Sequence, residues 1–289
     1  MKLPSLAAGL ARTRRAHGLL LLAWLAHHAL ALAAAAVPSA ALAWRLAATS
    51  TGAAMVAGSD DGEGFWQWVL TQADSPLTIP ALLLAALAAG LLWQLVWCAG
   101  VVTRWQSHEP LAAGQTIAAG IPRLLSFFVV ALAFLALAAV ASSTALALGL
   151  LIRPLARSGP AWAAPLVIGL RLLLVGVALL PCAAAAQIAK WQLAAGATPL
   201  AAVWRGLAAV GSRPLATTRP AVAWAAATIA LLGVWVAARL LAELSSPATV
   251  LLGHALLAAW AYALVRLRLG FLLAYADDAA APEETLEIP

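Results

Sequence analysis

The chain has 289 residues, of which 64% are hydrophobic and only 10% are charged. Soluble domains carry about a quarter charged residues, so the composition excludes an ordinary soluble domain and predicts an all-α polytopic membrane protein. A membrane-spanning helix needs about 20 apolar residues, and the sequence has room for six. The net charge is +6. Because the basic residues lie mostly at the ends of apolar runs, this charge indicates helix orientation rather than nucleic-acid binding.

The N-terminal segment begins with basic residues and continues into an apolar run from Gly18 to Ala43. Basic residues, an apolar run and the small residues of AVPSAALA follow one another as in a secretory signal peptide. The run is 26 residues long, however, whereas the apolar region of a signal peptide has about 7 to 15. We therefore expect an uncleaved first membrane helix, with a cleaved signal peptide as the alternative.

Five further apolar runs, each bounded by charges, Pro or Gly, complete a single integral membrane domain over residues 1–289. These runs are Ile79 to Thr103, Leu124 to Ile152, Ala163 to Ala189, Ala221 to Ala242 and Pro247 to about Val265. With the N-terminus inside, 12 basic residues lie on the cytoplasmic side: Lys2, Arg12, Arg14, Arg15, Arg104, Arg123, Lys190, Arg205, Arg213, Arg219, Arg266 and Arg268. Five lie outside: Arg45, Arg153, Arg157, Arg171 and Arg239. The positive-inside rule then places both termini, including the acidic tail 277–289, in the cytoplasm of a bacterial inner-membrane protein.

The longest outer loop, residues 44–78, contains the segment SDDGEGFWQWVL. Ser59 is a suitable helix cap, and the acidic residues after it suit a helix N-terminus. We expect a short helix on the outer face, with Trp66 and Trp68 in the membrane interface. A calcium site at Asp60, Asp61 and Glu63 is the alternative, but their spacing does not match an EF-hand loop.

Ionisable residues within or beside apolar spans are the first places to look for function, because a charge in hydrocarbon is costly. The intramembrane polar candidates are His27, His28, Arg171 and His254, and further charges lie at Arg239, Glu243, Arg266 and Arg268. His27 and His28 are adjacent and point about 100° apart on a helix, which suits structural hydrogen bonding better than a shared metal. Proton handling with His254 is the alternative. Arg171 is close enough to the outer end of its span to snorkel, and Arg239 and Glu243 form a neutralising i, i+4 pair.

No catalytic signature is present in the sequence. There is no GxSxG elbow, no phosphate-binding GxxxxGK[ST] loop and no intramembrane pair of aspartates. Cys98 and Cys182 lack disulfide or metal-site spacing and are expected to be small buried hydrophobes. We expect no catalytic residue, cofactor or metal. Many of the 13 tryptophans lie near the predicted span boundaries, as headgroup anchors do: Trp44, Trp66, Trp68, Trp105, Trp162, Trp191 and Trp204.

Two inner segments resemble each other. EPLAAGQTIAAGIPRLL begins at Glu109 and TPLAAVWRGLAAVGSRPLA begins at Thr198, which predicts parallel repeats over 79–152 and 163–242. We expect in-plane helices at 110–122 and 199–213. Their apolar positions would face acyl chains: Leu111, Ile117, Ile121, Leu200, Val203, Leu207 and Val210. Arg123, Arg205 and Arg213 are then candidate lipid-headgroup contacts. The alternative is that these helices only anchor the bundle.

The repeated order of apolar span, P-L-x-x-A/V segment, basic residue and second span gives the chain a family resemblance. From about Ile79 to Tyr275 it resembles the membrane-domain type of glycerophosphodiester phosphodiesterases and related uncharacterised six-helix bacterial inner-membrane proteins. The motif is degenerate. The resemblance implies a helical membrane module whose in-plane cytoplasmic helices border the lipid headgroups. We expect no soluble catalytic domain in this chain, so no enzymatic residue is carried over.

These features predict a non-enzymatic multi-pass membrane protein that binds or helps move a lipid-like ligand, or that scaffolds membrane partners. The alternative is a secondary transporter subunit, followed by a membrane-embedded enzyme. Coupled transporters usually hold acidic residues in the core, whereas here the only spanning-region acid is Glu243, at a helix end. The expected partners are membrane lipids and other membrane proteins, and not nucleic acid.

Overall fold

The computed structural model describes residues 5–30, 78–151, 163–241 and 247–276. These residues form α-helices, one short 3-10 helix and the connections between them, and no strand occurs in the described ranges. The all-α prediction is therefore confirmed. The chain divides into two compact units, a larger one made of residues 1–21 and 95–289 and a smaller one made of residues 22–94.

Within the described residues, five helices are long and apolar enough to cross a membrane, so the chain is a multi-pass membrane protein. They are α5 (Thr78–Gln106), α7 (Leu124–Leu151), α9 (Ala163–Ala194), α11 (Pro214–Leu241) and α12 (Pro247–Leu273). The first predicted span is helical over His17–Leu30, and the rest of it lies outside the described residues. The sixth crossing thus stays a prediction.

Three of the spans extend five or more residues beyond their apolar runs at one end. α9 continues five residues past Ala189, α11 begins seven residues before Ala221, and α12 continues eight residues past Val265. Pro214 suits the first position of α11, where its missing N–H is not needed. The added end of α12 and the three residues after it are buried inside the protein from Leu269 to Ala276. Packing between helices therefore makes these helices longer than the apolar runs that predict them.

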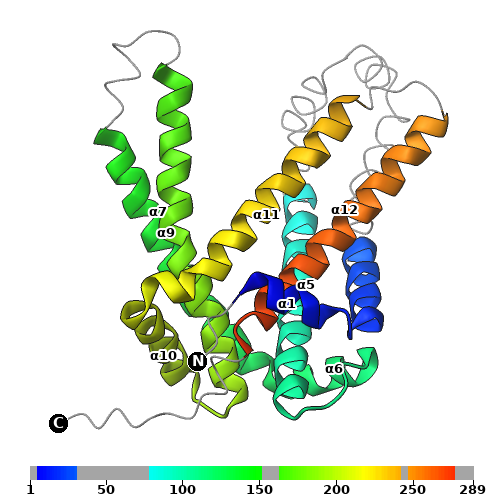
Figure 1. Cartoon of the computed structure of the whole chain (residues 1–289), viewed down its shortest axis with the longest axis vertical. Helices are drawn as coiled ribbons and strands as arrows, with labels where there is room; N and C mark the ends of the chain where they lie inside the picture. The colour runs from blue at the N-terminus through cyan, green and yellow to red at the C-terminus, as the bar shows by residue number, and fades with distance from the viewer. Residues whose placement is uncertain (1–4, 31–77, 152–162, 242–246, 277–289) are drawn as a thin grey trace. The chain divides into compact units, whose positions relative to one another are not determined.

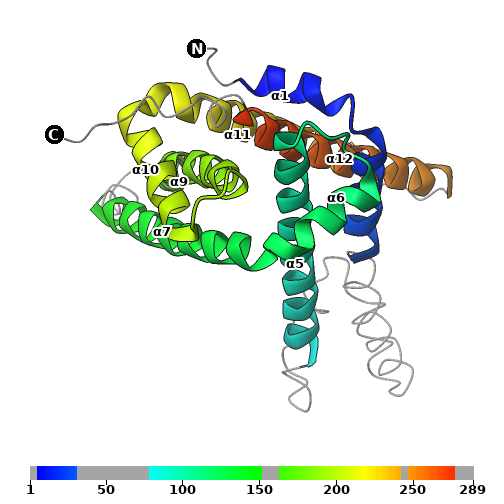
Figure 2. The ribbon, with the colours of Figure 1, turned by 90° about the horizontal axis from the view of Figure 1, so that it is seen from below.

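The larger unit contains a short N-terminal helix, α1 (Leu6–Thr13), that packs on the end of α12, and both views show the two side by side (Figures 1 and 2). Gly9 faces Gly270 so closely that a Cβ on Gly9 would collide with the Gly270 carbonyl. Arg12 donates to the Leu273 carbonyl at 2.8 Å, and Arg266 donates to the Thr13 hydroxyl at 3.2 Å. Arg266 is thus part of a helix contact and does not follow the span as predicted.

The helix α10 (Pro199–Ser212) joins α9 to α11 and packs along the end of α9 (Figure 1). Its buried face is Ala202, Gly206 and Val210, and a Cβ on Gly206 would lie 2.5 Å from the Ala185 carbonyl oxygen. The prediction that Val210 faces acyl chains is wrong, because Val210 is buried on this face of α10. Leu200 is 81% exposed, and its contact with acyl chains stays a prediction.

The first inner segment differs more from its prediction. It contains α6 (Ala113–Gly120) and the 3-10 helix η1 (Ile121–Arg123), so the helix begins three residues after Pro110. α6 packs on the last turns of α5, where a Cβ on Gly100 would collide with the Thr116 carbonyl. Leu111 lies before the helix in a non-helical connection, which corrects its assignment to a helical apolar face.

Candidate functional site

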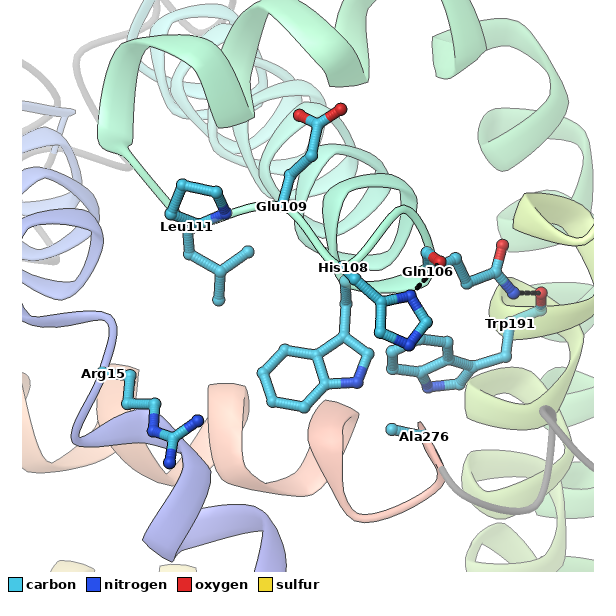
Figure 3. Close-up of a pocket in the computed structure, with 9 residues that line it drawn as sticks. Arg15, Gln106, His108, Glu109, Leu111, Trp191 and Ala276 are labelled. Carbon is cyan, nitrogen blue, oxygen red and sulfur yellow. Dashed lines mark hydrogen bonds between the residues drawn. The ribbon is translucent and has the colours of Figure 1, made fainter.

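A pocket of about 800 Å³ lies in the larger unit, where several helices end (Figure 3). α5 contributes its last two residues, the α5–α6 connection contributes four, and α9 contributes one. One residue each follows α1 and α12. The lining is Arg15, Trp105, Gln106, His108, Glu109, Pro110, Leu111, Trp191 and Ala276.

Trp191 forms a fixed wall of this pocket. Its side chain is 1% exposed, and its indole N–H donates to the Leu272 carbonyl at 2.9 Å. Its own carbonyl accepts a bond from the Gln106 side-chain amide at 3.0 Å. Because these bonds join α5, α9 and α12, Trp191 is a core residue. The prediction that it belongs to an exposed headgroup belt is wrong.

The α5–α6 connection lines the pocket through His108, Glu109, Pro110 and Leu111. Two bonds close the end of α5: the Glu109 N–H donates to the Arg104 carbonyl at 2.9 Å, and the His108 N–H donates to the Trp105 carbonyl at 3.1 Å. This is the Schellman pattern. It places His108 at φ 57°, in the left-handed region that most side chains avoid.

Arg104 fixes the position of this connection. Its guanidinium forms an ion pair with Glu109 at 2.8 Å, donates to the Pro110 carbonyl at 2.9 Å and donates to the Gln115 side chain at 2.7 Å. The Arg104 side chain is 10% exposed. Because the Glu109 carboxylate is held by Arg104, it does not cap a helix that would begin at Pro110. The backbone is not helical from Glu109 to Ala112, and the Ala112 N–H donates to the Pro110 carbonyl at 2.8 Å, which turns the chain at Leu111 beside the pocket.

The charges around the pocket are unequal. The Arg15 guanidinium makes no hydrogen bond or ion pair with the described residues, and Figure 3 shows this side chain across the pocket from Trp191. The one acid in the described lining, Glu109, is compensated by Arg104. The His108 Nδ1 lies 3.0 Å from the Gln106 carbonyl, which can only accept, so this nitrogen carries a proton and Nε2 is left for a ligand. The pocket therefore has an excess of positive charge.

The predicted headgroup arginines lie elsewhere. Arg123 donates to the carbonyls of Leu193 and Ala194 at 3.1 and 3.0 Å, so it caps the C-terminus of α9. Arg205 is exposed on α10 and donates to the Gln192 side chain at 3.3 Å. Arg213 is the exposed C-cap residue of α10. None of the three lines the described pocket.

The intramembrane candidates are engaged locally. His27 and His28 place Nδ1 at 2.6 and 3.1 Å from carbonyls one turn earlier on their own helix, and the His28 ring lies 4.5 Å from the Trp24 ring. Arg171 donates to the Gly149 carbonyl at 2.8 Å, which ties α9 to α7. His254 lies within α12, and its side chain is outside the described set, as is that of Arg239. Glu243 and the outer-loop residues Ser59 to Leu70 fall outside the described ranges.

The polar residues that give the pocket its character do not emerge from the sequence patterns. Arg15 enters there only as an orientation charge, and the run from Gln106 to Glu109 belongs to no recognised motif. A signal is nevertheless present: four consecutive polar residues, including His108, stand between two apolar spans and immediately precede a proline. Such a run cannot continue an apolar helix, and it supplies donors and acceptors at the membrane surface.

Comparisons with protein-family models, with curated proteins and with solved structures found no match to this chain.

Proposed function

We propose that this chain is a non-enzymatic multi-pass protein of a bacterial inner membrane that binds a lipid-like, amphipathic ligand in the pocket beside α5, α9 and α12. The observation that carries the proposal is the position of the pocket. It is built where apolar spans end, which is the level of the lipid headgroups if those spans cross the membrane.

The size and lining of the pocket support a ligand of this class. Small-molecule pockets enclose about 300 to 1,000 Å³ and combine apolar walls with a few placed polar groups. The volume of about 800 Å³ falls within this range. Trp105, Trp191 and Leu111 supply apolar surface, while Arg15 and His108 supply polar contacts. An amphipathic molecule would satisfy both kinds of surface at once.

The orientation is part of the same proposal. Arg12, Arg14, Arg15, Arg104 and Arg123 lie at or beyond helix ends in the described part of the larger unit, and a cytoplasmic position for them satisfies the positive-inside rule. Single cysteines at Ser59 and Pro282, in a chain with Cys98 and Cys182 replaced by Ala, test this. A membrane-impermeant thiol reagent on intact spheroplasts should label Ser59→Cys and spare Pro282→Cys; the reverse pattern would refute the orientation.

Lipid retention tests the binding proposal. The protein is extracted in native lipid particles, stripped with mild detergent, and analysed for bound lipid by mass spectrometry. Leu111→Trp fills the rim of the pocket, whereas Leu200→Trp adds the same bulk at a position that is 81% exposed on α10. We expect about one retained lipid per chain for the wild type and for Leu200→Trp, and loss of that lipid in Leu111→Trp at unchanged elution volume. Equal retention in all three proteins would contradict the proposal.

A further inference from the structure

We infer that the ligand of this pocket is an acidic phospholipid, whose phosphate is bound by Arg15 and whose headgroup extends to His108, while its acyl chains lie against Trp105 and Leu111. This inference rests on the proposed function and assigns the headgroup class. It also moves the headgroup site away from Arg123, Arg205 and Arg213.

The charge balance selects an anion. Arg15 is the cation in the described lining whose side chain makes no hydrogen bond or ion pair with a described residue. Glu109 does not neutralise it, because the Glu109 carboxylate is paired with Arg104 at 2.8 Å. Figure 3 shows the Glu109 carboxylate turned away from Arg15. A guanidinium in this setting presents several N–H donors to a phosphate.

His108 adds a second polar group to the pocket lining. Its Nδ1 lies 3.0 Å from the Gln106 carbonyl, so Nε2 can accept a hydrogen bond from a headgroup hydroxyl. Its left-handed backbone conformation, φ 57°, turns the residue out of the helix line of α5 and is fixed by the Schellman bonds at the end of that helix. This polar group is therefore positioned before a ligand arrives.

The remaining lining selects acyl chains over a free anion. Trp105, Pro110, Leu111, Trp191 and Ala276 are apolar and form most of the residues that surround the cavity. A small inorganic anion would leave this surface against water, whereas a lipid would cover it. Arg12 lies over the Trp105 ring at 5.8 Å and holds that indole in place. The apolar walls therefore favour a phosphate that carries acyl chains.

The test uses the full-length protein reconstituted in nanodiscs that contain equal amounts of phosphatidylglycerol and phosphatidylcholine. Native mass spectrometry reports the lipids that stay bound on release. The variant is Arg15→Gln, and the matched control is Arg14→Gln, which changes the same type of exposed residue one position away and outside the pocket lining. We expect retained phosphatidylglycerol for the wild type and Arg14→Gln. Arg15→Gln should retain at least about tenfold less, the change expected when a charge-assisted hydrogen bond is lost, and His108→Asn should also retain less.

The other outcomes distinguish a failure of the headgroup assignment from a failure of the proposed function. If the wild type retains both lipids without preference and Leu111→Trp retains neither, the proposed function stands and the acidic-headgroup assignment is overturned. Absence of any retained lipid in the wild type would overturn the proposed function itself. Inorganic phosphate at millimolar concentration should not displace the lipid. Full displacement of the lipid by phosphate alone would identify a free-anion site and overturn the lipid inference. Equal loss of retained lipid in Arg14→Gln and Arg15→Gln would also overturn it.

Discussion

The α5–α6 connection and the α9–α10 connection begin in the same way and end differently. In both, a left-handed residue comes after the helix, His108 at φ 57° and Gly196 at φ 95°. In both, the Schellman bonds run to the same relative carbonyls, those of Trp105 and Arg104 in one and those of Leu193 and Gln192 in the other. The backbone therefore leaves both helices along the same path.

The two connections differ in how the next helix begins. In the second connection Thr198 caps the next helix by accepting a bond from the Ala201 N–H at 3.4 Å, and α10 begins at once at Pro199. In the first connection the residue before the proline is Glu109, whose carboxylate is held by Arg104. Glu109 follows the left-handed residue directly, whereas Ala197 stands between Gly196 and Thr198. α6 then starts at Ala113 without a side-chain cap. The two connections thus differ by the cap residue and by one residue in length, and the first of them borders a pocket.

The largest effect is expected from removing the arginine that each connection depends on. Arg104→Leu deletes the ion pair and the bonds to Pro110 and Gln115, and should destabilise the connection by about 3 kcal/mol. Amide hydrogen exchange over residues 107–112 should become about a hundredfold faster, with residues 195–198 unchanged. Arg123→Leu should instead accelerate amide exchange at residues 195–198 and leave residues 107–112 unchanged, because Arg123 donates to the carbonyls of Leu193 and Ala194. Equal acceleration of both connections in either variant would show that the two are not independent.

Replacing Glu109 by a helix-capping residue should give a smaller effect, in which amide exchange becomes slower. Glu109→Thr supplies the first connection with the cap that Thr198 provides in the second, and a helix cap is worth about 1 kcal/mol. We expect α6 to extend back toward Pro110, seen as slower exchange at residues 110–113, and the retained lipid to be lost. Unchanged exchange at these residues would mean that Glu109 does not determine where α6 begins.

The left-handed residues should respond in opposite directions. Gly196→Ala places a Cβ in a conformation that costs about 1 kcal/mol, so it should lower thermal stability. His108→Gly removes a similar cost from the first connection and should raise its stability while weakening ligand binding. Thermal unfolding followed by size-exclusion chromatography measures both. A loss of stability in His108→Gly would show that the imidazole contributes more to the fold than to the site.

The smallest effect concerns α10, whose Leu200 and Trp204 are 81% and 72% exposed beside Arg205. This face suits anchoring in the membrane interface, with each basic residue worth about 1 kcal/mol at an anionic surface. Trp204→Phe should reduce the fluorescence quenching caused by nitroxides at the headgroup level. Arg205→Gln should leave the retained lipid unchanged, because Arg205 does not line the described pocket. Loss of that lipid would return the headgroup site to α10.

The long apolar helices were predictable from the sequence, whereas the contacts between helices were not. Apolar length predicts the spans because hydrocarbon thickness imposes it, and Leu124 was predicted correctly as the first residue of α7. The last residues of α12 were not predicted, because they are buried by α1 and Trp191 rather than by lipid. Glu109 and Thr198 occupy matching positions in similar segments, yet the contact of Glu109 with Arg104 depends on a turn that the pattern does not encode. The parallel repeat itself stays a prediction.

Photocrosslinking tests most directly whether the ligand lies at the α5–α6 connection or at α10. A phosphatidylglycerol analogue with a photoreactive headgroup is incorporated into nanodiscs with the wild-type protein, irradiated, and mapped by peptide mass spectrometry. We predict crosslinks in the peptides that contain Arg15 and residues 105–111, and their loss in Arg15→Gln but not in Arg14→Gln. Crosslinks concentrated on residues 199–213, or spread evenly over all helix ends, would contradict a ligand site at the α5–α6 connection.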